Sequence, residues 1–289
     1  MNGMAYRMRT HRAGGRKIAI GLLAGFTLAI GVCVAAEPEP TPTVQPIVFP
    51  APSLTVAADT NTPPLWFPVG EQLRFRIYWG AIPVGEIQST SSWVEVKGQR
   101  LLEATYRARS NRVLRQLYPV DDVMVTTIDP VHFLPVCFRM DMKEGGHIRL
   151  ETTTFDYAAG KAVWRATGKN KTREYAIDRE THDLLSLLYY LRKEGFQSGS
   201  NRIVRVLAER KVRDLTVVVD GHETVKVPGL GAVDCLRLRP NIDFEGLFVS
   251  TGALTFWVSA DAHCICTRAK VSIPVGSITA ELIEWTRPK

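Results

Sequence analysis

The sequence predicts a mainly β protein whose single curved antiparallel sheet closes into a barrel or β-roll, with one apolar helix over about residues 181–194 packed on it. Three observations support this fold class. Long stretches alternate apolar and polar side chains, the pattern of a strand with one buried face and one wet face. Glycine, aspartate and proline residues that favour turns separate these stretches. Only one stretch shows the apolar spacing of a helix.

Residues 1–36 have the layout of a secretory signal peptide. Five basic residues precede an apolar run at 18–30, and the small residues Ala35 and Ala36 follow at a cleavage position. The run is shorter than the ~20 residues of a spanning helix, and no similar segment follows, so no transmembrane span is expected after leader removal. A lipid anchor at Cys33 is not expected either, because Val32 stands where a lipoprotein signal needs a small residue. The predicted location is periplasmic or extracellular.

The charge balance argues against a nucleic-acid partner. The full chain has a formal net charge of +7, but five of its 36 basic residues lie in the leader. The remaining 31 basic and 29 acidic residues leave a net charge of +2 and form no basic run. The electrostatic footprint of a nucleic-acid-binding surface is therefore missing from the sequence.

Two further segments follow the leader. Residues 37–64 hold eight prolines in 28 positions, a composition typical of a disordered, polyproline-like tether. Residues 65–289 are expected to form a single β-rich globular domain, since all-β domains of this length commonly do not divide.

The domain begins as a meander of strands. Leu73, Phe75 and Ile77 alternate with Arg74 and Arg76, which predicts a strand over 73–79. Turn residues at 81–85 and 98–99 place the next two strands at 86–97 and 100–109. Later strands, with a turn between two of them at Asp220-Gly221, are expected at 122–128, 136–143, 146–156, 161–166, 172–177, 202–208, 215–219, 232–240, 254–259, 267–273 and 277–285.

One segment has helical periodicity. The spacing i, i+3, i+4 and i+7 is occupied by Leu184, Leu187, Leu188 and Leu191. Thr181 or Asp183 is the expected N-cap, and Gly195 the expected stop. Further apolar neighbours widen this face, so the helix should be largely covered. It is expected across the mouth or concave face of the sheet, either as an ordinary core helix or as a mobile lid.

Five segments in order resemble a known family. They are FPVGEQL at 67–73, WGAIPVG at 79–85, DLLSLLYYLR at 183–192, GALTFWVSAD at 252–261 and IPVGSI at 273–278. The ordered set resembles the exported bacterial family called domain of unknown function 3108. The resemblance implies an exported β-rich protein and brings no assigned activity and no catalytic residues.

No catalytic signature stands out. The Gly-x-Ser-x-Gly, His-Glu-x-x-His and phosphate-loop motifs are all missing from the sequence, so we assign no catalytic residues and expect no cofactor. A pair of carboxylates about 5–10 Å apart would still suffice for glycan hydrolysis. Charged residues on alternating strands usually form only a solvated face, and those that could supply an acid or base are Asp121, Asp122, Glu151, Asp156, His132 and His147.

Four cysteines remain after the leader. In an oxidising compartment a disulfide between Cys235 and Cys264 is the first candidate, and buried inert thiols are the alternative. His263, Cys264 and Cys266 could bind zinc or copper with a remote fourth ligand such as Cys235. Their spacing lacks the Cys-x-x-Cys knuckle of structural zinc sites, so no metal is expected.

The favoured function is non-enzymatic binding of a lipid or other hydrophobic ligand, or of an envelope protein partner. Curved sheets enclose such ligands in periplasmic lipoprotein carriers, an analogy of fold alone. The alternatives are a cell-envelope hydrolase that uses a carboxylate pair and a purely structural envelope protein. An apolar cavity would favour the first function, and buried paired carboxylates the hydrolase. The candidate ligand-binding residues, drawn from the aromatic set, the helix and the irregular 241–252 stretch, are Trp79, Leu188, Tyr189, Phe244, Phe248 and Trp257.

Overall fold

One sheet of 15 strands accounts for nearly all of the fold. The structure is a computed structural model that describes residues 63–168, 171–193, 195–241, 254–273 and 276–288. It contains the short helices α2 (Arg112–Arg115) and α3 (Leu184–Tyr190). The strands are β1 (Gln72–Trp79), β2 (Ile82–Val96), β3 (Gln99–Ser110), β4 (Asp121–Asp129), β5 (Leu134–Glu144), β6 (His147–Asp156), β7 (Lys161–Ala166), β8 (Lys171–Ala176), β9 (Thr181–His182), β10 (Asn201–Ala208), β11 (Lys211–Val227), β12 (Gly231–Asn241), β13 (Thr255–Ser259), β14 (Cys266–Ile273) and β15 (Gly276–Thr286).

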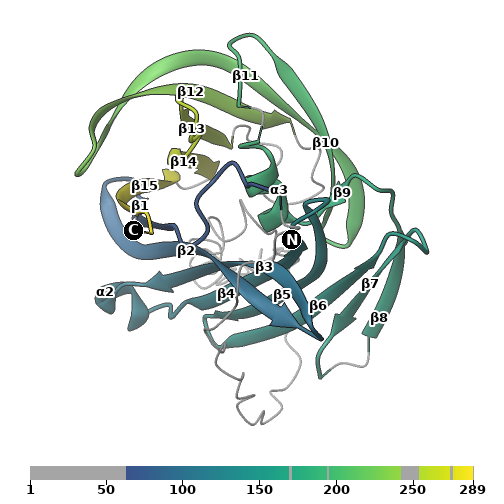
Figure 1. Cartoon of the computed structure of the whole chain (residues 1–289). Helices are drawn as coiled ribbons and strands as arrows, with labels where there is room; N and C mark the ends of the chain where they lie inside the picture. Colours follow the sequence, from purple (N-terminus) through teal and green to yellow (C-terminus); the bar gives the residue numbers. More distant parts are fainter. Residues whose placement is uncertain (1–62, 169–170, 194, 242–253, 274–275, 289) are drawn as a thin grey trace, which may run out of the picture.

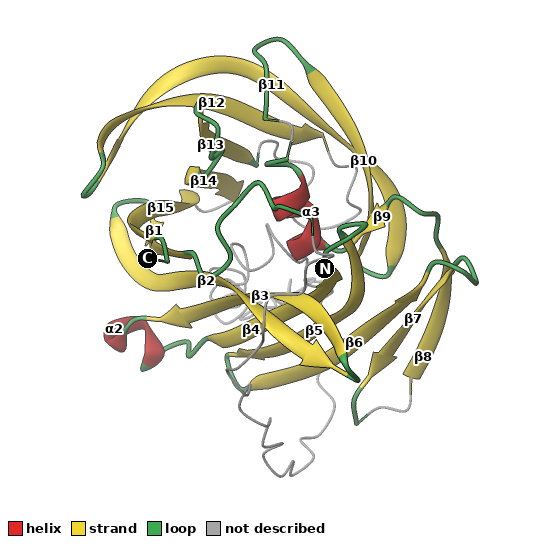
Figure 2. Ribbon diagram, viewed as in Figure 1, coloured by secondary structure: helices red, strands yellow, loops and turns green. Residues whose placement is uncertain are grey.

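The strands form a meander in which the first strand also pairs with the last. It runs β8-β7-β6-β5-β4-β3-β2-β1-β15-β14-β13-β12-β11-β10-β9, so β1 pairs with β15 and every other neighbour is consecutive in sequence. All pairs are antiparallel except β9 with β10, which is parallel. The sheet is therefore mixed and mostly antiparallel. Figures 1 and 2 show it wrapped around a central space in which α3 lies.

Of the two predicted forms, a closed barrel and a roll, the structure has the one that is not closed. Strands β8 and β9 stand at opposite ends of the strand order and do not pair with each other. The sheet instead curls until its ends meet through packing, since β9 contacts β5 and β8 contacts β11. A closed barrel requires a continuous hydrogen-bonded ladder, and this roll lacks that ladder between its two edges.

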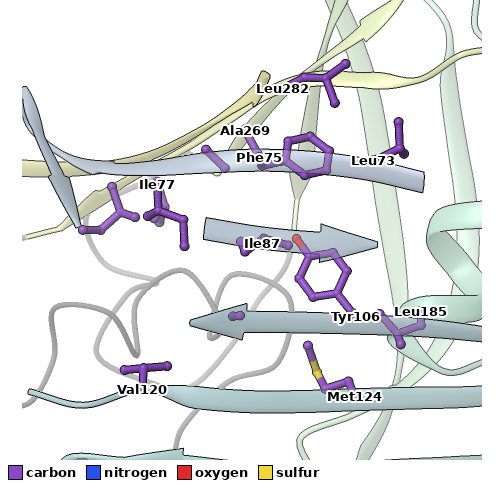
Figure 3. Close-up of a cluster of buried hydrophobic side chains, with 14 of the residues drawn as sticks. Leu73, Phe75, Ile77, Ile87, Tyr106, Val120, Met124, Leu185, Ala269 and Leu282 are labelled. Carbon is purple, nitrogen blue, oxygen red and sulfur yellow. The ribbon is translucent and has the colours of Figure 1, made fainter. Parts of the chain in front are cut away.

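Each predicted strand overlaps a strand of the structure, although β9 was not predicted and the predicted strand 215–219 is only part of β11. In β1, Leu73, Phe75 and Ile77 are buried while Arg74 is exposed. Figure 3 shows such inward side chains from neighbouring strands meeting in the largest core cluster, which also takes Leu185 from α3. The alternation thus defines the concave face on which the helix packs.

The predicted turn at Asp220-Gly221 is wrong. Strand β11 continues through it, with a register shift between Val219 and Gly221 against β12. A β-carbon at Gly221 would lie 3.3 Å from Arg237 Nη2, so glycine here permits a close approach of that side chain. The chain turns after β11 at residues 228–230 and continues into β12. A separate two-residue turn at Glu209-Arg210, where both φ angles are positive, 50° and 60°, joins β10 to β11.

The one predicted helix is shorter in the structure. Helix α3 covers Leu184–Tyr190 and not 181–194, because Thr181 and His182 form β9 and the chain leaves the helix at Leu191. The predicted cap Asp183 is confirmed, since its side chain accepts hydrogen bonds from the backbone N–H groups of Leu185 and Ser186. Helix α2 was not predicted. No helix in the described part of the chain is long and apolar enough to cross a membrane.

A buried ion pair joins the end of α3 to the start of β1. Arg192 and Glu71 are both buried, and the guanidinium donates to both Glu71 carboxylate oxygens, Nη2 at 3.2 Å. Arg192 Nε also donates to the His263 carbonyl at 3.0 Å, and Trp285 Nε1 donates to Glu71 Oε2 at 3.4 Å. Four segments distant in sequence thus meet at one charged pair.

We predict that Arg192→Leu destabilises the fold strongly, because it leaves the Glu71 carboxylate buried without its charged partner. The free energy of unfolding, measured by urea denaturation, should fall by about 3–5 kcal/mol. Arg76→Leu is the control, since Arg76 forms an exposed pair with Glu86 at 3.4 Å and should cost less than about 1 kcal/mol. Equal losses in the two variants would contradict the importance of the buried pair.

Candidate functional site

An apolar cavity of about 150 Å³, partly open to the surface, lies between α3 and the concave face of the sheet. Its walls come from both arms of the roll, β1–β3 on one side and β11–β15 on the other. The lining is predominantly aliphatic and aromatic, and includes Leu73, Phe75, Tyr106, Leu184, Leu188, Leu215, Leu238, Phe256, Val258 and Ala280. Cavities of this character bind apolar ligands.

Hydrogen bonds at the N-terminus of helix α3 hold this helix beside the cavity. The fully buried Asp183 accepts from the backbone N–H groups of Leu185 and Ser186 at 2.8 and 2.9 Å, and from Thr126 Oγ1 of β4 at 2.5 Å. Desolvation raises the pKa of Asp183 to about 6, although these hydrogen bonds act to lower it. The cap therefore ties the helix to the opposite strand at the cost of a buried carboxyl group.

The C-terminal end of α3 is held by Tyr189. Its hydroxyl lies 3.3 Å from Ser89 Oγ on β2, and its carbonyl accepts from Trp66 Nε1 at 2.8 Å. Burial raises the pKa of this phenol to about 12, so it stays neutral. Arg192, in its pair with Glu71, completes the wall at this end. The helix is thus anchored at both ends while Leu184 and Leu188 face the cavity.

The structure brings two of the predicted ligand-binding residues together, Leu188 and Tyr189, which both line the cavity. Trp79 and Trp257 are not part of its lining. Trp257 is buried elsewhere, with its Nε1 donating to Glu223 Oε2 at 2.7 Å. Phe244 and Phe248, with most of the predicted 241–252 loop, lie outside the described residues.

Several lining residues were missed in the sequence. Phe256 and Val258 flank Trp257 on β13 and line the cavity, as successive strand residues point to opposite faces. The alternation was visible in the sequence, but the face that meets the cavity was not. Cys266 and Arg192 also contribute to the walls. The sequence suggested only a metal-binding role for Cys266 and no site role for Arg192.

The cysteines form no metal centre here. Among the described residues, no group of three or more His, Cys, Asp or Glu side chains is placed to hold a metal ion. The His263 ring packs edge-on against Trp285 at 5.1 Å. Burial raises the pKa of the Cys264 thiol, and that of Cys266 to about 12. Buried, protonated thiols are poor ligands and poor nucleophiles.

The proposed disulfide partners stand apart in their contacts. Cys235 and Cys264 are free thiols in the structure. Cys235 Sγ lies 3.2 Å from Thr267 Oγ1, whereas Cys264 Sγ donates to the Asp261 carbonyl at 3.3 Å. Their pairing in an oxidising compartment stays a prediction.

A buried carboxyl pair lies on β4 and β5, away from this cavity. Asp122 and Glu144 are both almost fully buried, and desolvation together with repulsion from Asp122 raises the pKa of Glu144 to about 8. Lys143 N donates to Asp122 Oδ1 at 2.8 Å. Neither carboxyl group lines the apolar cavity, so the pair is a feature of the core and has no direct access to a ligand there.

The comparison with protein families identifies the chain. A family model described as "Protein of unknown function (DUF3108)" matches residues 74–283. This chain belongs to the DUF3108 family. The match covers β1 to β15, and hence both arms of the sheet and α3 of the DUF3108 domain. No curated protein matches the chain.

Solved structures relate the DUF3108 fold to other families. A β-barrel-like protein of domain of unknown function DUF1849 from Brucella abortus superposes with a TM-score of 0.51 at 13% identity, over 77% of this chain and 99% of that one. A DUF1089 family protein from Pseudomonas aeruginosa gives a TM-score of 0.34 at 13% identity, over 62% and 87% of the two chains, too low to carry an argument. The first likeness shows a barrel-like fold and nothing about activity.

We predict that Asp183→Asn changes how the stability of this DUF3108 protein depends on pH. The raised pKa of Asp183 means that its contribution is fully present below about pH 4 and is lost as the pH rises to about 6. Asparagine keeps the capping oxygen and cannot ionise. The variant should therefore gain about 2–3 kcal/mol relative to wild type on going from pH 3.5 to pH 7.5, measured by urea denaturation at both values.

Asp156→Asn provides the matched control. Asp156 is exposed, and its Oδ1 likewise accepts a backbone hydrogen bond, from Ala159 N at 2.9 Å. The gain between the two pH values should be smaller for this variant than for Asp183→Asn, because Asp156 is exposed and Asp183 is fully buried. An equal gain in the two variants would show that Asp183 ionises normally in the fold.

Proposed function

We propose that the protein binds a hydrophobic ligand, without catalysis, in the cavity between α3 and the sheet. The observation that carries this proposal is the apolar lining of that cavity, drawn from both arms of the roll. Burial of a ligand there would be favourable at about 25 cal/mol per Å² of apolar surface removed from water. Arg192, the charged residue in the wall, is paired with Glu71, and most of the remaining lining is apolar.

The size of the cavity limits the ligand. Drug-sized ligands occupy pockets of about 300–1,000 Å³, whereas apolar cavities of about 150 Å³ accept small apolar molecules. The volume found here, about 150 Å³, supports a slender group such as a single hydrocarbon chain. A bulky ring system would require α3 to move.

The setting proposed for this binding is the cell envelope. The signal-like leader at 1–36 and the proline-rich stretch at 37–64 support an exported, tethered domain, although both lie outside the described residues. In that setting the ligand would be a lipid or another envelope hydrophobe, and an envelope protein would be the source or recipient of it. A purely structural envelope role needs no cavity, and the cavity therefore favours binding.

The hydrolase alternative finds less support. It requires two carboxylates that face a substrate cleft at a separation of about 5–10 Å. The paired carboxyl groups of Asp122 and Glu144 are buried and line neither the apolar cavity nor a polar cleft beside it. A substrate would have no route to them without opening β4 and β5.

We predict that the protein binds methyl cis-parinarate, a neutral fluorescent probe with a single unbranched hydrocarbon chain, and that Leu188→Trp weakens this binding. The larger side chain would occupy part of the cavity, and exclusion of roughly 60 Å² of apolar contact costs about tenfold in affinity. Leu117→Trp is the matched control, since Leu117 is 83% exposed and should leave affinity unchanged. The measurement is a fluorescence titration of the purified protein, accompanied by native mass spectrometry to detect co-purified lipid.

The outcomes are distinct. Weaker binding by the Leu188 variant alone supports a ligand site beside α3. Absence of dye binding and of any bound mass in the wild-type protein would contradict the proposal. Equal effects of both substitutions would place the dye on the surface.

A further inference from the structure

A second, smaller cavity adjoins the first. It measures about 50 Å³ and lies where the Glu209-Arg210 turn meets side chains of β5 to β8. This is the side of the sheet on which its two ends, β8 and β9, do not pair with each other. Figure 1 shows β7 and β8 on the same side of the molecule as β10. Leu184, the first residue of α3, lines both cavities. The two cavities therefore share this residue of helix α3 in their walls.

The second cavity differs from the first in its charged side chains, although apolar residues such as Phe138, Met140 and Trp164 also line it. Arg149 and Glu151 of β6 and Glu209 and Arg210 of the turn contribute to its lining. Glu151 is already engaged, because it accepts a hydrogen bond from Trp164 Nε1 at 3.0 Å. Arg149 Nε is buried and forms no hydrogen bond within the described residues, since the Glu151 oxygen that pairs with it is 3.6 Å away. A donor in this position requires an acceptor.

The electrostatic surroundings favour an anionic acceptor. Arg149, Arg210, Lys211 and Arg213 all act on Glu209, so basic groups outnumber the carboxyl groups at this site. Burial nevertheless raises the pKa of Glu209 to about 7, so this carboxyl is partly protonated near neutrality and can then act as a donor. Its Oε1 is buried and has no hydrogen-bond partner in the described structure.

The backbone of the turn supports a functional role. Glu209 and Arg210 both adopt positive φ angles, 50° and 60°, a conformation that this type of turn normally assigns to asparagine and glycine. Strain of this kind is concentrated at functional sites. Here it brings a carboxyl group and a guanidinium group to the same small cavity.

We propose that the second cavity binds the anionic head group of an amphiphile whose hydrocarbon chain occupies the apolar cavity, with Leu184 in the wall of both. The inference rests on the proposed function, because it presumes that the apolar cavity holds the chain. Arg149 and Arg210 supply the positive charge, and Arg149 Nε the donor. The ligand is then an anionic single-chain amphiphile or the anionic end of a larger lipid.

The head-group site should respond to pH through Glu209. The charged or titratable groups near it are Arg149 and Glu151 on β6, Tyr175 on β8, and Arg210, Lys211 and Arg213 on the turn and β11. Protonation of Glu209 removes a negative charge beside the head group. An always-ionised amphiphile should therefore bind several-fold more tightly at pH 6 than at pH 8.

The experiment uses decyl sulfate, decanol and inorganic sulfate as competitors of methyl cis-parinarate on the full mature protein. Decyl sulfate should displace the dye at lower concentration than decanol, which has the same chain without the charge. Inorganic sulfate alone should not displace the dye. In Arg149→Gln the affinity for decyl sulfate should fall about tenfold, while the affinity for decanol changes less than about twofold.

Two further variants guard the interpretation. Arg165→Gln is the matched control, because Arg165 is the exposed neighbour of Trp164 on β7 and does not line the cavity. Arg210→Gln tests the site independently if Arg149→Gln has a lowered urea midpoint. It should reproduce the selective loss of decyl sulfate binding.

Failure of this inference differs from failure of the proposed function. If the wild-type protein does not bind the dye or decanol, hydrophobic ligand binding itself is refuted. If decanol competes as well as decyl sulfate, or Arg149→Gln and Arg210→Gln behave like Arg165→Gln, the head-group site is refuted and the apolar site stands. If inorganic sulfate displaces decyl sulfate as effectively as a second anionic amphiphile does, the second cavity binds free anions and not a head group.

Discussion

The pairing of the first strand with the last is the constraint on which the rest of the structure depends. Strand β1 aligns with β15 from Gln72 opposite Thr286 to Trp79 opposite Ile278. Every other strand pair joins neighbours in sequence, so without this seam the chain would form two separate meanders. Phe75 of β1 and Ala280 of β15 both line the apolar cavity. The seam that unites the arms therefore also forms part of the ligand space.

Helix α3 depends on its attachments more than on its own propensity. An isolated helix of seven residues is not stable in water, because nucleation costs more than so few hydrogen bonds return. Asp183 holds its first turn against Thr126 of β4, and Arg192 holds the chain beyond its last turn against Glu71. Both anchors are buried polar groups with specific partners. They place Leu184 in the walls of both cavities and Leu188 in the wall of the apolar cavity.

Local patterns predicted the strands well and the site only in part. Period two located the strands because each has one face in the core, as in β1. The cavity is assembled from β1, α3 and β13, whose proximity depends on pairing between distant strands. Phe256 and Trp257 are adjacent on β13, and both are apolar and at least half-buried. The sequence could therefore not indicate which of the two side chains faces the ligand space. The sequence also left a closed barrel and an open roll as alternatives, since pairing between the edge strands is a property of the whole sheet.

Because the sheet is not closed, β8 has one edge that is paired with no described strand. Exposed backbone at such an edge is a template for strands from other molecules. Lys171, Arg173 and Glu174 project from β8 and are exposed. An incoming strand would have to strip water from these charges before it could pair. The side chains of one short strand thus protect the molecule from uncontrolled assembly, a protection that a closed barrel obtains from its own hydrogen bonds.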